Sequence, residues 1–447
     1  MSVAGGPGGP APAVDGGPEY GPPAPTVVRG VALSAGLLVL WAGALAAERL
    51  GALDATGALG TTHLLFAGVA CTAIAAAVPQ FVAVWSTTPL RWPHLAAAAP
   101  PLVAVGTLGV AGGFLTGSLL LTALGGIPLA GGLWSLTASV TRTVLPCRPW
   151  DATERGLIAG TWSLALGGAL GLVVGATHAT TLGPVLGVDY PALVGAHATL
   201  MVLGGVLGVG YAGVFRLSSM LTGAPDDPRV QRVAAAVATV HPASVGLLAG
   251  GRLVGVRTVA LAGAVGVVTC AFAAGAVVAR RVWVGRESSP ATRRYGVVAV
   301  ALPAWGATAG ARWAADPLAR TAVLGGRAAE PLLWGAVVCL VVGSLYHVGP
   351  FLVWLERYAD RLGLEPVPTV DDLYDDRVAR VDGAALVVGV AALTAAAADA
   401  PWATTLGAVG AAVLVVAAAG VCANLVRVVH LHAPWTVAEV MVGGTPE

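Results

Sequence analysis

The sequence contains no lysine, and all 24 of its basic residues are arginine. Only 11% of its 447 residues are charged and the formal net charge is +1, so no overall field attracts nucleic acid. Without lysine there is no phosphate-binding Gly-x-x-x-x-Gly-Lys loop, and the His-Glu-x-x-His, Gly-x-Ser-x-Gly and dinucleotide-binding motifs are also absent. These absences argue against a nucleic-acid-binding protein and against the catalytic sites typical of soluble enzymes.

Cysteine is also scarce, and no two cysteines are spaced as metal ligands or disulfide partners. The sequence has no Cys-x-x-Cys pair and no zinc-knuckle spacing. Most of the cysteines stand inside apolar runs, where they behave as small hydrophobic residues. The five are Cys71, Cys147, Cys270, Cys339 and Cys422.

Apolar residues make up 56% of the chain, and the mean hydropathy is +0.81, more than a water-soluble globule can bury. The apolar runs are long enough to cross a hydrocarbon core of about 30 Å as helices. The sequence therefore predicts an all-α polytopic protein of about twelve transmembrane helices in the lipid bilayer of the plasma membrane. The predicted spans are 29–48, 61–86, 93–115, 117–140, 156–177, 190–215, 233–251, 256–280, 295–314, 330–355, 382–399 and 402–427.

The arginines are distributed unevenly between the two sides of this predicted bundle. Eighteen of the 24 fall on the side of the N-terminus, which the positive-inside rule assigns to the cytoplasm. We expect residues 1–28, rich in Gly, Pro and Ala, to form a disordered tail. The transmembrane domain is predicted to cover 29–435, with a charged cytoplasmic loop at about 356–381 and a C-terminal tail at 436–447. The interleaved acids and arginines of that loop, counted to Asp382, suit a solvated, salt-bridged segment better than a site for a hard cation.

Histidines carry most of the chemical information, because an ionisable side chain in hydrocarbon is costly and usually faces a cavity, a partner or a cofactor. His63 lies early in the second span and His197 early in the sixth, which predicts similar depths for both rings. The two segments also resemble a distant internal repeat, each with a histidine a few residues before a Gly-Val step. His241 lies near the middle of the seventh span, before Pro242. His347 lies about 25 Å along the tenth span, so a single site built from all the histidines is excluded by depth.

These features resemble subunit I of the heme–copper oxidase superfamily and the related NnrS-type membrane proteins. The likeness covers residues from about 30 to 435 and rests on the twelve spans and on the order of His63, His197 and His241. It implies heme bound near the outer end of the second helix and copper bound by histidines of the sixth and seventh. The sequence departs from the oxidases in lacking a His-x-His pair on the tenth helix, where His347 stands alone. A complete oxygen-reducing centre is therefore not expected, and whether the protein is an enzyme stays open.

Neutral imidazole is a common axial ligand of heme iron and a good ligand for copper. We therefore predict cofactor binding by His63 and His197, with His241 as a third ligand or a supporting group and His347 as a weaker metal candidate. Such a protein would handle nitric oxide, oxygen or redox equivalents, with an electron donor or other membrane subunits as partners. The alternative for each histidine is a purely structural hydrogen bond. The alternative functions are a non-catalytic scaffold subunit or a secondary transporter, which would break its helices near the Gly-rich runs 124–132 and 203–213.

Overall fold

The computed structural model describes residues 21–180, 188–225, 227–398 and 400–442. Within these ranges the chain consists of helices and their connections, without a β-strand. The first half contains α1 (Ala24–Arg49), α2 (Ala55–His63), the π-helix η1 (Leu64–Ala70), α3 (Cys71–Trp85), α4 (Pro93–Thr116), α5 (Leu119–Val144), η2 (Leu145–Cys147), α6 (Ala152–Thr180), α7 (Tyr190–Ala198), the π-helix η3 (Thr199–Leu207) and α8 (Gly208–Thr222).

The second half continues the same pattern of long helices joined by short connections. It contains α9 (Pro228–Val254), α10 (Arg257–Val284), α11 (Pro290–Ala315), η4 (Arg320–Ala322), α12 (Glu330–Tyr358), η5 (Ala359–Arg361), η6 (Val370–Leu373), α13 (Asp376–Ala395), α14 (Ala403–His432) and α15 (Val437–Val442).

The predicted all-α membrane architecture is confirmed. Eleven helical segments of the described chain are long and apolar enough to cross a membrane, and each matches one predicted span. The remaining predicted span, 295–314, corresponds to α11, which has 26 residues but carries three arginines and is less apolar.

Many helix ends differ from the prediction by several residues, and α13 begins at Asp376, inside the predicted loop. The helix α1 begins at Ala24, inside the segment predicted as a tail, because Pro23 and Pro25 favour a helix start there. The second span begins at Ala55 rather than 61, since the Asp54 side chain caps it by accepting from the Gly57 N–H. The short helix α15 lies in the segment predicted as a C-terminal tail. Residues 1–20 of the predicted N-terminal tail lie outside the described residues.

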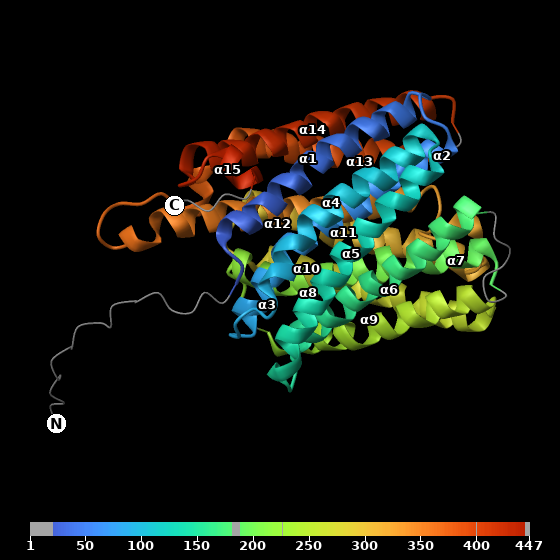
Figure 1. Ribbon diagram of the computed structural model, residues 1–447, viewed down its shortest axis with the longest axis horizontal. Helices are drawn as coiled ribbons and strands as arrows, with labels where there is room; N and C mark the ends of the chain where they lie inside the picture. The colour runs from blue at the N-terminus through green and yellow to red at the C-terminus, as the bar shows by residue number, and fades with distance from the viewer. Residues whose placement is uncertain (1–20, 181–187, 226, 399, 443–447) are drawn as a thin grey trace.

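The helices run side by side along the long axis of the molecule (Figure 1). One end, where α1 begins and α14 ends, collects the arginine-rich connections and is called the basic end below. The helices α2 and α7 both begin at the opposite end, on the right in Figure 1. Glycine allows close packing in places: a Cβ on Gly109 of α4 would lie 2.7 Å from Cα of Gly125 in α5.

The two π-helices lie inside otherwise continuous spans and follow similar histidines. His63 is the last residue of α2, and His197 is the penultimate residue of α7. Six residues after each histidine, a buried carbonyl accepts a side-chain hydrogen bond from another helix. The Ser34 hydroxyl donates to the Val69 carbonyl at 2.9 Å, and His241 Nε2 contacts the Leu203 carbonyl at 2.8 Å. The predicted internal similarity therefore extends to a shared α–π–α geometry.

A cluster of polar side chains, here called the Asp382 cluster, joins α11, α12, α13 and α14 in the half nearer the basic end. Asp382 and Arg294 form a buried ion pair, with 1% and 2% of their surfaces exposed. Tyr346 donates its hydroxyl hydrogen to Asp382, and the Asn424 amide donates to Tyr346 at 3.1 Å. The prediction that counts Asp382 with the solvated loop is wrong, because its partner Arg294 reaches it only after the helices assemble.

Candidate cofactor site

His63 and His197 come together in the half of the bundle away from the basic end. Their ring centroids are 6.5 Å apart, and the ring planes are inclined by only 20°. The residues lie at equivalent depths because His63 is the ninth residue from the start of α2 and His197 the eighth from the start of α7. We call these two residues the His pair. The structure thus brings together the two histidines that the sequence singles out first.

Hydrogen bonding fixes which nitrogen of each ring is available. His63 Nδ1 lies 2.7 Å from the Leu59 carbonyl oxygen, and His197 Nδ1 lies 2.8 Å from that of Gly167. A carbonyl can only accept, so each Nδ1 carries the hydrogen and each Nε2 keeps its lone pair. Neither Nε2 has a hydrogen-bond partner within the described ranges. This is the arrangement seen for metal-binding histidines, whose second nitrogen is commonly anchored to a backbone carbonyl.

Two neighbouring helices hold the rings in place. The ring of His63 lies on that of Phe114 from α4, with centroids 5.1 Å apart. The ring of His197 fits against Gly171 of α6, where a Cβ would lie 2.8 Å from its Cε1 atom. Because real Cβ contacts are longer than this, any larger residue at 171 would push the imidazole away. The position of His197 therefore depends on a glycine whose role nothing in the sequence marks.

Arg252 is a buried charged residue that contacts the helical segment carrying His197. It lies at the end of α9, is 6% exposed, and donates to the hydroxyl of Thr199, two residues beyond His197. It also donates to the carbonyls of Pro317 and Val323 and lies over the Trp313 ring. No carboxylate pairs with it in the described part of the chain, and its Nη2 atom has no partner there. The predicted seventh span ends at residue 251, whereas α9 continues to Val254 and includes the buried Arg252.

The other two predicted histidines do not join the pair. No three His, Cys, Asp or Glu side chains of the described chain lie close enough to hold a metal ion. His241 bonds to Leu203, roughly 9 Å farther along the helical segment that carries His197, so the structure does not place it beside the pair, and its role as a third ligand or a supporting group stays a prediction. His347 stacks on Phe351 with centroids 5.5 Å apart, in the half nearer the basic end. It therefore gains no support as a metal ligand.

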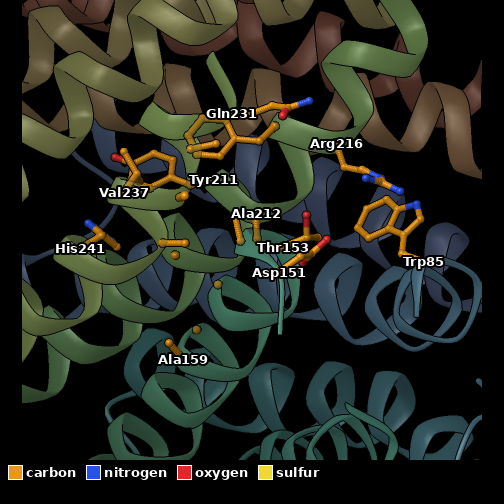
Figure 2. Close-up of a pocket in the computed structure, with 18 of the residues that line it drawn as sticks. Trp85, Asp151, Thr153, Ala159, Tyr211, Ala212, Arg216, Gln231, Val237 and His241 are labelled. Atoms are coloured by element: carbon orange, nitrogen blue, oxygen red, sulfur yellow. The ribbon is translucent and has the colours of Figure 1, made fainter. Parts of the chain in front are cut away.

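A separate cavity of about 770 Å³ lies between α3, α6, α8 and α9 (Figure 2). Its walls include Tyr211 and His241 in the interior of the bundle and Asp151, Arg216 and Gln231 nearer the basic end. Tyr211 is 3% exposed and was not among the predicted site residues. The only hint in the sequence is a hydroxyl-bearing side chain inside the glycine-rich run 203–213.

No known protein-family model matches this chain, and no curated protein is significantly similar to it.

Proposed function

We propose that the protein is a membrane redox protein that binds heme between His63 and His197. The observation that carries this proposal is the His pair itself, with two nearly parallel rings and two Nε2 atoms that have lone pairs and no partner. Two imidazoles that bind one metal ion from opposite sides place their ring centroids about 6 Å apart, since each metal–nitrogen bond is about 2.1 Å long. The observed 6.5 Å agrees with this distance.

Arg252 supports an anionic cofactor rather than a bare metal ion. A guanidinium remains charged at any physiological pH, and a buried one normally pairs with an acid. Arg252 has none in the described chain, and it bonds to Thr199, two residues after His197 in the same helical segment. The carboxylates of a heme group would supply the missing negative charge.

Heme held by two histidines supplies one-electron redox chemistry. If His63 and His197 both served as ligands of the heme iron, they would leave no position for oxygen or nitric oxide, so electron transfer fits this pair better than gas reduction. The backbone carbonyls of Leu59 and Gly167 orient the rings. At residues 124–132 and 203–213, the Gly-rich runs named for the transporter alternative, the chain is helical, and the second run begins inside the π-helix η3.

The experiment is an absorption spectrum of the detergent-purified protein, oxidised and then reduced with dithionite, with metal content measured on the same sample. We expect a Soret band that shifts on reduction and that His63→Ala and His197→Ala each abolish. His94→Ala is the control, since it removes an exposed histidine of α4 at the basic end. A preparation without colour and metal, or one that binds copper without heme, would contradict the heme proposal.

A further inference from the structure

The cavity between α3, α6, α8 and α9 contains two buried polar atoms that lack partners. The Tyr211 hydroxyl and His241 Nδ1 have no hydrogen bond within the described residues, although both side chains are only 3% exposed. Their rings meet edge to face with centroids 4.9 Å apart. An unpaired polar group in such a place is energetically costly, so both atoms point to a molecule that the cavity receives.

The hydrogen-bonding role of each atom can be assigned. His241 Nε2 faces the Leu203 carbonyl and must donate to it, so the neutral ring presents a bare Nδ1 as an acceptor. Tyr211 presents a hydroxyl that can donate. A single oxygen atom can satisfy both groups only if it accepts from Tyr211 and donates to His241. A hydroxyl group can do both, whereas an ether or carbonyl oxygen can only accept from Tyr211.

The other residues that line the cavity indicate the size, polarity and charge of the ligand. Around the two polar groups the lining is small and apolar, including Gly160, Gly204, Gly208 and Ala238. The volume of about 770 Å³ lies within the range of small-molecule sites. Toward the basic end the lining carries Asp151, Arg216 and Arg281. Arg281 already donates to the Phe215 carbonyl and the Ser218 hydroxyl, so the other two charges, one of each sign, favour neither an anion nor a cation. Figure 2 shows His241 and Arg216 on opposite sides of this space.

We infer that this cavity is a binding site for an uncharged, largely apolar molecule whose hydroxyl group is held by Tyr211 and His241. The ligand enters from the basic end, where Asp151 precedes α6 and Gln231 lies in the first turn of α9. His241 is about 20 Å along α9, so the hydroxyl end reaches the middle of the bundle. The site is separate from the His pair and does not require heme.

The test measures binding of three probes to the full-length protein in lipid nanodiscs, with empty nanodiscs subtracted. The probes are 2-naphthol, 2-methoxynaphthalene and naphthalene, which have similar apolar bodies but differ in hydrogen bonding. We expect 2-naphthol to bind about tenfold more tightly than 2-methoxynaphthalene, and naphthalene to bind most weakly, because one hydrogen bond is worth about a fivefold to tenfold change in affinity. Equal affinity for the three probes, or no saturable binding at all, would overturn the inference.

Two variants locate the binding. Tyr211→Phe should weaken 2-naphthol binding about fivefold to tenfold, with little effect on naphthalene. The control Tyr295→Phe removes a hydroxyl that already bonds Ser344 outside the cavity, so it should leave binding unchanged. Ala238→Leu fills the cavity from α9 and should abolish binding, whereas Ala236→Leu adds the same bulk on an exposed face of that helix. Unchanged 2-naphthol binding in both Tyr211→Phe and Ala238→Leu would show that the probe sits elsewhere.

Discussion

The His pair and the Asp382 cluster are both polar and both lie among apolar helices, but their hydrogen bonding differs. In the Asp382 cluster, the carboxylate accepts from Arg294 and Tyr346, and Tyr346 accepts in turn from Asn424. In the His pair, one nitrogen of each ring donates to a backbone carbonyl, and the other nitrogen has no hydrogen-bond partner in the described chain. The side chains of the Asp382 cluster bond mainly to one another and so join four helices, with Arg294 Nε alone among them unpaired in the described chain, whereas each ring of the His pair keeps one nitrogen available for a ligand.

The largest effect that separates the two regions should come from Asp382→Ala. This change leaves the Arg294 guanidinium buried without its counter-charge, which costs about 3–5 kcal/mol of unfolding free energy. Thermal unfolding of the purified protein should shift to a much lower temperature.

The matched control for that change is Asp376→Ala. Asp376 pairs with Arg293 and Arg380, but its side chain is 53% exposed, and exposed ion pairs contribute at most about 1 kcal/mol. If the two variants unfold at the same temperature, the Asp382 cluster does not hold the four helices together.

A smaller and more local effect is expected from Gly171→Leu. The new side chain would displace the His197 ring, so cofactor binding should fall severalfold, while overpacking costs about 1–3 kcal/mol of stability. Gly175→Leu is the control, because a Cβ on Gly175, one turn along the same helix, meets nothing within 4 Å. Heme content per chain is the measurement, and equal content in both variants would contradict the proposed role of His197.

The smallest effect concerns the connection between α12 and α13. Asp372 accepts from the Thr369 hydroxyl and N–H at 2.7 and 2.8 Å, and these bonds lower the pKa of its carboxyl group. Because the folded pKa is lowered, the carboxylate stabilises the turn above the unfolded pKa of about 4 and ceases to do so as pH falls through the folded pKa.

Hydrogen exchange at the Thr369 amide should therefore accelerate as the pH drops from about 5 to 3, after correction for the intrinsic exchange rate. Asp372→Asn should remove this pH dependence, since an amide does not titrate. Asp360→Asn should retain it. An identical pH profile in the two variants would show that another group controls the turn.

Hydropathy alone was enough to predict the helical architecture, because only helices satisfy the backbone in a bilayer. The equal depth of His63 and His197 followed from their places near the starts of two spans. The closeness of the two rings within the membrane plane could not be predicted, because the order of the helices around the bundle depends on close contacts such as Gly109 with Gly125. Sequence spacing carries no information of that kind.

The contacts that the sequence did not reveal share one property: they join residues from distant helices. Arg252 reads as a loop residue until Thr199 and Pro317 surround it. Asp382 reads as part of a charged loop until Arg294, 88 residues earlier, reaches it. Tyr211 and His241 become a pair only when α8 and α9 pack together. Local composition predicts burial, whereas the identity of a partner requires the assembled fold.

The π-helices make the two histidine-bearing spans sensitive to chain length. A π-turn accommodates one more residue than the α-turn it replaces, so deletion of one residue within 64–70 or 199–207 can restore a regular α-helix. Such a deletion would leave the hydropathy almost unchanged but would remove the wider turn, so side chains and carbonyls of that turn would shift away from their present partners. His197 and the Tyr211 face of the cavity would then no longer point correctly at the same time. The extra residue in each π-helix therefore determines how the residues around it meet their neighbours, and the surroundings of both histidines depend on it.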